Sequence, residues 1–426
     1  MKKKNKKPKG IKKFFANLGP GFITGASDDD PSGIATYSQT GAHFGYNQLW
    51  TALFSFPFMA TIQETCGRIG LVTGKGLAGV MKKHYSRSIL YFSVLILLIS
   101  NTINIGADLG AMAAAGRLVF GLPFIVWLLG ITAVTLFLQV FISYKTYAQF
   151  LKYLTLTLLT YIVVAVMVKQ DWIQIAWATF VPSFSFSKEY LLNIVAILGT
   201  TISPYLFFWQ ADQEVEEEVS RKEIRSMGVG TPKFKSRELK AIKIDTIIGM
   251  FFSNLIMFFI IVTTASTLGL HGITDIQTAD QAAMALRPIA GDFAYLLFAL
   301  GIIGTGLLAV PVLAGSASYA LAESFGMKEG LYKKFKQAHG FYGVITVATI
   351  VGLLINFTPI SPFKMLYYTA VLNGVCAPPF MVIIMLIANN KKIMGKYTNK
   401  KWSNWLGWSI TGIMSVCAIA LIISLF

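Results

Sequence analysis

The sequence predicts an all-α membrane protein with about eleven transmembrane helices in one domain. Of its 426 residues, 54% are hydrophobic and only 13% are charged, whereas a soluble domain carries roughly 25% charged residues. The hydrophobic residues form long continuous runs, and about 20 such residues span a bilayer as a helix. The strands of a membrane barrel would instead alternate in short segments, so helices are favoured.

The expected spans follow one another with short connections. They cover residues 14–43, 48–70, 89–117, 122–142, 148–168, 190–213, 243–268, 290–322, 340–357, 365–389 and 404–426. A basic tail at residues 1–13 precedes them, and we expect it in the cytoplasm, disordered or lying on anionic lipid headgroups. Nothing in the composition indicates an additional soluble domain, so residues 14–426 are expected to form a single transmembrane domain.

The net charge of +17 is distributed unevenly along the chain. Most lysines and arginines lie in the tail and in alternate connections, around residues 68–87, 145–152, 221–243, 328–336 and 391–401. This is the positive-inside pattern. It predicts a multi-pass protein of the cell membrane with its N-terminus in the cytoplasm and its C-terminus outside, embedded in the lipid bilayer. It also argues against a nucleic-acid partner, because the basic residues flank apolar spans.

The cysteine and histidine patterns argue against several other classes of protein. Cys66, Cys376 and Cys417 lie in or beside spans without paired spacing, so neither a disulfide framework nor a thiolate metal site is indicated. No two of the four histidines are three or four residues apart, which argues against a zinc cage. The sequence has no phosphate-binding glycine loop and no nucleophile with a partnered base, so we expect neither an enzyme nor a cofactor.

Three consecutive carboxylates lie inside the first expected span. A carboxylate at bilayer depth costs roughly 2.5–3.5 kcal/mol on insertion scales, so Asp28, Asp29 and Asp30 must face water, a cation or a cavity rather than lipid. Pro31 follows directly, and proline interrupts the helix there and frees carbonyl oxygens that bind hard cations. We therefore expect Asp30 to be a cation ligand, and Asp28 and Asp29 to line a water-filled vestibule or a secondary site.

A second break is expected in the sixth span, where Ser203 precedes Pro204 among small residues. Interrupted hydrophobic segments at corresponding places of two halves indicate a transporter built from inverted repeats. The first repeat would cover about 14–168 and the second about 190–389, five spans each, followed by an extra helix at about 404–426.

Further polar residues lie in or beside the spans, and for each we expect an interhelical hydrogen bond or a vestibule position more often than metal ligation. They are Glu64, Asn101, Asn104, Asp108, Asp212, Glu214, Asp245, Asn254, Glu323 and Asn373. The longest internal connection, residues 212–245, is strongly charged. A solvated loop is the simpler interpretation of it, and a segment coupled to a gate is the sharper one.

Five stretches of the sequence carry a family resemblance. Residues 30–33 read DPSG, and a known transporter family has Asp-Pro-Gly-Asn at this place in its first helix. Residues 44–50 contain the FGY and LW that end the same helix in that family. Residues 199–205 read GTTISPY, in the place of the sixth-helix Gly-Ala-Thr-Val-Met-Pro-His. Residues 70–79 and 106–112 are similar to the loop after the second helix and to the third helix. Together these stretches resemble the natural resistance-associated macrophage protein (NRAMP) family of divalent metal transporters.

The resemblance implies a LeuT-type fold, an inverted 5+5 repeat with helices 1 and 6 broken, and a central metal site at the two breaks. Carried over by position, Asp30 would be the carboxylate ligand of the metal, and Ser27 and Thr200 would offer backbone carbonyl oxygens. Ser203 would stand at the fourth ligand position, where the family has methionine.

Four positions depart from the family pattern. The family's ligand asparagine is Gly33 here, and its sixth-helix histidine is Tyr205, so both residues are assigned to a vestibule or secondary role. The third-helix aspartate is retained as Asp108, a candidate for a proton path, but the glutamate three residues later is Ala111. The fourth departure, Ser203 for methionine, removes a thioether that selects softer transition metals. The chain therefore resembles a divergent branch of the family.

These departures predict the cargo and its coupling. Losing the side chains of the asparagine and the methionine would widen an oxygen-lined cavity, which suits Mg²⁺ because this ion keeps part of its water shell. We therefore expect secondary uptake of a divalent cation by alternating access, with Mg²⁺ first and Mn²⁺ second, and weak or absent proton coupling. The alternative is an ion-coupled carrier of a small organic solute such as an amino acid, against which the carboxylate cluster argues; a metal-gated channel or sensor is a third class.

Overall fold

The computed structural model describes residues 19–142, 155–291 and 293–424. It is helical almost throughout, and within these ranges it contains no strand, only an isolated bridge between Ser226 and Val229. The predicted tail at residues 1–13 and the basic residues near 145–152 lie outside the described residues. The all-helical fold class predicted from the hydrophobic runs is confirmed.

The first half of the chain runs from the first broken helix to a short surface helix. It contains α2 (Pro20–Asp28), α3 (Pro31–Phe44), α4 (Trp50–Thr73), α5 (Leu77–His84), α6 (Arg87–Phe120), α7 (Phe124–Phe141), η1 (Thr155–Leu158), α9 (Leu159–Met167) and α10 (Trp172–Phe180). The second half repeats the pattern of a broken helix followed by long helices. It contains α11 (Lys188–Thr201), α12 (Pro204–Ser220), α13 (Ser236–Thr267), η2 (Gly269–His271), α14 (Ala279–Ala283), η3 (Met284–Leu286), α15 (Arg287–Ala290), α16 (Phe293–Phe325), η4 (Phe335–Gln337), α17 (His339–Ile355), α18 (Pro362–Asn389), α19 (Lys391–Met394), η5 (Gly395–Tyr397) and α20 (Lys401–Ser424).

Every predicted span overlaps a helix or a pair of consecutive helices. Seven helical stretches among the described residues are long and apolar enough to cross a membrane, and the apolar helices at Leu156–Met167 and His339–Ile355 are shorter. The total of eleven crossings stays a prediction. The boundaries shift by several residues, because helices such as α6 and α16 continue past the apolar core into their polar ends.

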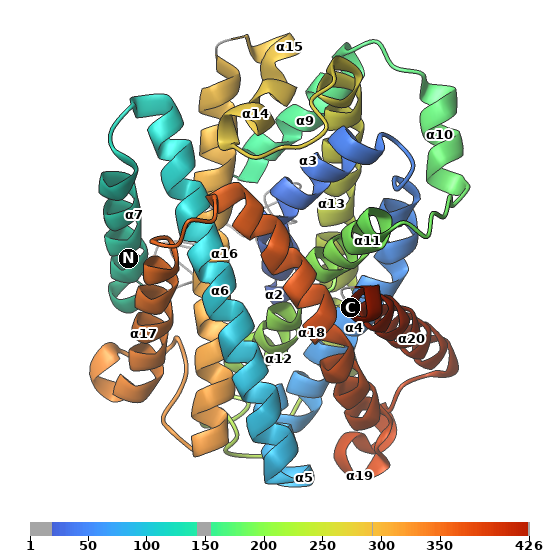
Figure 1. Cartoon of the computed structure of the whole chain (residues 1–426). Helices are drawn as coiled ribbons and strands as arrows, with labels where there is room; N and C mark the ends of the chain where they lie inside the picture. Colours follow the sequence, from blue (N-terminus) through green and yellow to red (C-terminus); the bar gives the residue numbers. More distant parts are fainter. Residues whose placement is uncertain (1–18, 143–154, 292, 425–426) are drawn as a thin grey trace, which may run out of the picture.

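Both predicted helix breaks are present. Asp29 and Asp30 separate α2 from α3, and Ile202 and Ser203 separate α11 from α12. A proline begins each second half-helix, at the position where its missing N–H leaves no donor unsatisfied. In Figure 1 α2 and α12 lie in the middle of the bundle, and α12 contacts α4, α6, α16 and α18. The broken helices are therefore the inner elements and the unbroken ones surround them.

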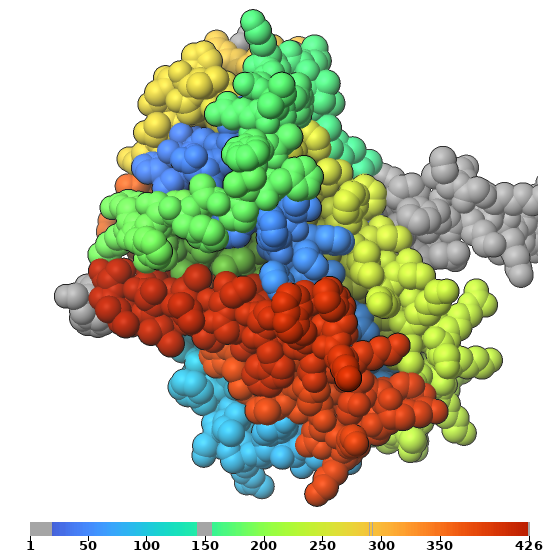
Figure 2. Space-filling view, turned by 90° about the vertical axis from the view of Figure 1, so that its right-hand side faces the viewer, coloured from blue at the N-terminus to red at the C-terminus, as the bar shows by residue number. Residues whose placement is uncertain are grey.

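The basic connections that the structure describes gather at one end of the molecule. The N–H of Gly228 donates to the carbonyl of Gly74 at 2.8 Å, and Lys82 Nζ donates to the carbonyl of Glu323 at 3.1 Å. Figure 1 shows α5 and α19 at this end and α10, α14 and α15 at the opposite end. Figure 2 shows α20 lying across the outside of the bundle. This arrangement agrees with the alternation of charge along the sequence.

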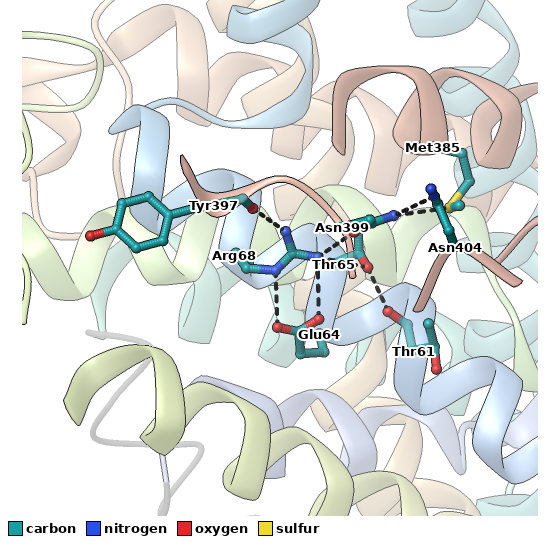
Figure 3. A network of polar contacts seen from close by, with 8 residues as sticks. All are labelled: Thr61, Glu64, Thr65, Arg68, Met385, Tyr397, Asn399 and Asn404. Carbon is teal, nitrogen blue, oxygen red and sulfur yellow. Dashed lines mark hydrogen bonds and ion pairs between the residues drawn. The ribbon is translucent and has the colours of Figure 1, made fainter. Parts of the chain in front are cut away.

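A buried arginine ties α4 to the segment before α20 (Figure 3). Arg68 Nε donates to Glu64 Oε1 at 3.0 Å within the helix. Its other nitrogens donate to the carbonyl of Tyr397 at 2.6 Å and to Asn399 Oδ1 at 2.5 Å. Glu64, expected to make an interhelical bond or line a vestibule, instead pairs with the cation that makes the connection between the two segments. The network joins α4 to the segment before α20 and contains no residue of either break.

Candidate metal centre at the helix breaks

Asp30 begins α3 as its N-cap residue. Its backbone is extended, with φ −69° and ψ 171°, and its Oδ1 accepts hydrogen bonds from the N–H of Gly33 at 2.8 Å and from the hydroxyl of Ser32 at 2.6 Å. Aspartate is among the preferred residues at this position, and the helix dipole favours its charge. The local sequence therefore holds the Asp30 carboxylate at the break and leaves its second oxygen, Oδ2, directed away from the helix.

Oδ2 of Asp30 meets two polar groups from other helices. The hydroxyl of Tyr205, in the first turn of α12, lies 3.3 Å from it, and Asn104 Nδ2 of α6 approaches to 3.5 Å. The same tyrosine hydroxyl lies 3.2 Å from the backbone carbonyl oxygen of Ser27. All four residues are buried. Tyr205 thus brings together the Asp30 carboxylate and the Ser27 carbonyl, two of the predicted metal ligands, and does so from the second break.

Thr200 lies beside the first break through Gly33. A Cβ at Gly33 would stand 3.2 Å from Thr200 Oγ1, 3.3 Å from the carbonyl oxygen of Asp28 and 3.3 Å from the ring of Tyr37. Thr200 Oγ1 is buried with no hydrogen-bond partner among the described residues. These three groups lie close to the space that a side chain at residue 33 would enter, and the widening of the cavity at this position stays a prediction.

Ser203 directs its hydroxyl toward the end of the helix that precedes it. Its Oγ lies 2.7 Å from the carbonyl oxygen of Gly199 and 2.8 Å from that of Thr200. A hydroxyl has one proton and can donate to only one of these oxygens. Ser203 therefore closes the last turn of α11, and its role as a metal ligand stays a prediction.

Asp28 and Asp29 are both buried, and their expected place in a vestibule stays a prediction. Ser253 Oγ of α13 lies 2.5 Å from Asp28 Oδ2 and 3.2 Å from Asp29 Oδ1. The cause is the close approach of α2 and α13. A Cβ at Gly25 would stand only 2.4 Å from the backbone of Gly249, so the carboxyl groups one turn later are pressed against Ser253. The secondary-site interpretation of Asp28 and Asp29 remains a prediction.

A polar stripe on α6 faces the same region. Asn101, Asn104 and Asp108 recur at helical spacing, and Asn101 Nδ2 donates to the carbonyl of Leu313 at 2.9 Å. Asp108 is fully buried, and neither of its oxygens has a hydrogen-bond partner in the part of the chain that the structure describes. It lies within electrostatic range of Asp30. The retained third-helix carboxylate therefore stands near the candidate ligand, as its proposed role in a proton path requires.

The sequence pattern does not predict three of these contacts. They are the contacts of Asn104 and of Tyr205 with Asp30, and the contact of Ser253 with Asp28. The spacing of Asn101, Asn104 and Asp108 is the signal that could have pointed to Asn104, since residues three, four and seven apart share a helix face. Ser253 carries no such signal, because only the packing of α13 on α2 places it.

The site concentrates negative charge without a matching side-chain cation. Among the residues that the structure describes, no lysine or arginine forms a salt bridge with Asp28, Asp29, Asp30 or Asp108. Nor do three or more histidine, cysteine, aspartate or glutamate side chains converge there as in a resident metal site. One carboxylate oxygen with neutral oxygens around it can bind a cation and release it again, which is what a cargo site needs.

The chain is similar in sequence or in fold to known metal transporters. The divalent metal cation transporter MntH of Klebsiella pneumoniae subsp. pneumoniae is 25% identical over 406 residues, which cover 94% of this chain and 92% of that protein. The manganese transporter of Eremococcus coleocola, solved with an aromatic bis-isothiourea substituted compound, has a TM-score of 0.75 at 15% identity, and the match covers 98% of this chain and 88% of that one. These are similarities of sequence and of fold, respectively.

A more distant structure shares the architecture. Mhp1, a nucleobase-cation-symport-1 family transporter in a closed conformation, has a TM-score of 0.50 at 13% identity, with coverage of 96% and 90%. The fold is the LeuT-type arrangement that the family resemblance implied. The family described as natural resistance-associated macrophage protein-like matches residues 21–424. The chain therefore belongs to the natural resistance-associated macrophage protein-like family.

Proposed function

We propose that this protein imports a divalent metal cation by alternating access, with Asp30 as the primary ligand. A member of this family is a membrane transporter of divalent metal cations and not an enzyme, and the metal is its cargo and not a cofactor. The observation that carries the assignment of the site is the buried Asp30 carboxylate at the first break, whose Oδ2 faces Tyr205 from the second break. Movement of one half-helix against the other would change the shell around the ion.

Magnesium is the proposed preferred cargo, with manganese second. The oxygens near Asp30 are the Ser27 carbonyl and the Tyr205 hydroxyl, and Thr200 lies beside Gly33 at the same break. None of these groups contains sulfur, and oxygen donors suit hard cations, whereas a thioether would favour softer ones. This preference rests mainly on donor chemistry, because three groups already lie close to Gly33.

The N-terminus is proposed to lie in the cytoplasm of the cell membrane. The gathering of the basic connections at the end that carries α5 and α19 supports this orientation. A cavity of about 430 Å³ is lined by the carboxylates of Glu189 and Asp275 and also by His43 and Lys364. We propose it as the outer approach for the cation.

Uptake of Mg²⁺ into proteoliposomes, followed with a magnesium-sensitive dye, tests the assignment. Asp30→Ala should abolish saturable uptake while the protein still folds, because it removes the charged ligand. Asp280→Ala, which removes an exposed carboxylate in the short helix α14, is the matched control and should transport like the unaltered protein. Unchanged uptake kinetics in Asp30→Ala would refute the proposed site. Saturable uptake of a neutral amino acid in place of metal would instead favour the organic-solute alternative.

A further inference from the structure

A second pair of carboxyl groups meets at the end of the molecule that carries the basic connections. Asp212 of α12 and Glu323 of α16 both reach Gly76, just before α5. A Cβ at Gly76 would stand 1.8 Å from Asp212 Oδ1 and 2.7 Å from Glu323 Oε2. The two carboxyl oxygens therefore lie close to each other beside Gly76. They can do so only because residue 76 has no side chain.

Glu323 is held in place by the start of α5. Its Oε1 accepts from the N–H of Gly76 and its Oε2 from the N–H of Gly79, both at 2.7 Å. The side chain is buried, and the first-turn N–H groups of a helix favour a negative charge. These hydrogen bonds stabilise the charged carboxylate of Glu323, but they do not stabilise the neighbouring carboxyl group of Asp212.

Asp212 has no comparable support. It is 0% exposed, and neither of its oxygens has a hydrogen-bond partner among the described residues. In the same part of the chain, no salt bridge joins Asp212 or Glu323 to a lysine or arginine. The nearby Lys75 donates its Nζ to the carbonyl of Gly228 at 3.1 Å. A buried carboxylate without a partner, next to a second carboxylate, is strongly unfavourable unless a cation lies between them or a proton neutralises one of them.

Two further acidic side chains add to the negative potential. Glu216 and Glu329 lie within electrostatic range of Asp212. Glu216 accepts hydrogen bonds from the Tyr319 hydroxyl and from the N–H of Leu331, so its carboxylate is committed to the loop after α16. Lys75 and Lys82 lie near Glu323, and Lys333 lies near Glu329. The negative charge that lacks a nearby cation or hydrogen bond is therefore centred on Asp212.

We propose that Asp212 and Glu323 form a second divalent-cation site, separate from the site at the breaks. Mg²⁺ is usually bound through one or two carboxylates and retains several waters, which matches two convergent carboxyl oxygens better than a cage of three or more. The ion would connect α12, the half-helix that follows Ser203, to α16 and α5. Occupancy would hold the inner half of the second break against the surrounding helices, so metal accumulated in the cytoplasm would slow further import.

Metal binding to the purified full-length protein in an Asp30→Ala background tests the site without interference from the transport site. Mn²⁺ serves as the paramagnetic probe, followed by electron paramagnetic resonance and competed with Mg²⁺. We expect one bound Mn²⁺ in Asp30→Ala, displaced by Mg²⁺, and at least tenfold weaker binding in Asp30→Ala/Asp212→Asn. Glu217→Gln in the same background removes a carboxylate from the more exposed side of α12 and should leave binding unchanged.

Two results would overturn the proposal. One is the absence of bound Mn²⁺ in Asp30→Ala, which would mean that a shared proton and not a metal reconciles the two carboxyl groups. The other is equal binding with and without Asp212→Asn. If the Asp212 variant does not fold, Asp30→Ala/Glu323→Gln provides the same comparison, and the rise in unfolding temperature on adding Mg²⁺ provides a second readout that should disappear with the site.

Discussion

Both helix breaks place an oxygen-bearing residue directly before a proline, but the two side chains have different roles. At the first break, the Asp30 side chain caps the helix that follows it, because its Oδ1 accepts from the N–H of Gly33. At the second break, the Ser203 side chain contacts the helix that precedes it, with its hydroxyl near the carbonyl oxygens of Gly199 and Thr200. An oxygen-bearing residue before a proline thus supplies a charge in one case and closes a helix end in the other.

This difference divides the work of the site. The first break provides the negative charge that attracts a cation, and the second provides Tyr205, whose hydroxyl meets both Asp30 and the Ser27 carbonyl. Binding strength should therefore depend mainly on the first break, and selectivity and fine adjustment mainly on the second. Three substitutions test this division, and a fourth tests proton coupling.

Asp30→Asn should produce the largest effect, because it removes the negative charge of the proposed ligand and keeps a side chain that can cap α3. Asparagine caps helices about as well as aspartate, so the protein should fold and unfold at a similar temperature. The neutral amide cannot replace a charged metal ligand, so saturable uptake of Mg²⁺ and Mn²⁺ into proteoliposomes should be lost. Transport that survives in Asp30→Asn but not in Asp30→Ala would show that Asp30 acts through the cap alone.

Ser203→Met should change selectivity at the second break. A thioether at this position favours softer ions, and we expect the preference for Mn²⁺ over Mg²⁺ to rise on the order of tenfold, about 1.4 kcal/mol. Competition of the two ions for uptake measures the ratio. An unchanged ratio would mean that residue 203 does not face the ion and serves only to end α11.

Tyr205→Phe should have a smaller effect, on affinity rather than selectivity. It removes a hydroxyl that contacts Asp30 Oδ2, and a hydrogen bond contributes about 1 kcal/mol net, so the apparent metal affinity should fall about fivefold at most. Tyr342→Phe, which removes a hydroxyl bonded to the carbonyl of Lys333 outside the site, is the control. Equal affinity losses in the two variants would assign the effect to stability instead of the site.

Asp108→Asn should have the smallest effect of the four substitutions. It tests proton movement, and little proton movement is expected in the unaltered protein. The glutamate and histidine of the family's relay are Ala111 and Tyr205 here, and a phenol has an ordinary pKa of about 10. A divalent ion gains about 4.6 kcal/mol per 100 mV from the membrane potential, since each charge gains roughly 2.3 kcal/mol. This is sufficient to drive uptake without a second substrate.

Vesicles loaded with a pH-sensitive dye under a fixed potassium-diffusion potential measure this coupling. No metal-dependent acidification is expected in either protein. Acidification that follows metal entry and disappears in Asp108→Asn would overturn the uncoupled transport and make Asp108 the proton carrier.

Much of the architecture was predictable because its causes are local. Hydrophobic runs of membrane length set the helices, since backbone groups in lipid must be satisfied within their own segment. Asp30-Pro31 and Ser203-Pro204 predicted both breaks, because proline acts on the residue before it and on its own turn. The capping geometry of Asp30 also follows from four consecutive residues. For these features the sequence by itself was enough.

Contacts between distant segments were decided only by the tertiary structure. Asn104 and Tyr205 are 74 and 175 residues from Asp30 along the chain, and no local pattern states that their side chains meet it. Asp28 and Asp29 are buried against Ser253 because glycines let α2 and α13 approach. In the same way, Gly76 lets Asp212 meet Glu323. The sequence determined which polar groups lie within the membrane domain; close packing, which depends on the shapes of all neighbouring helices, decided which of them face one another.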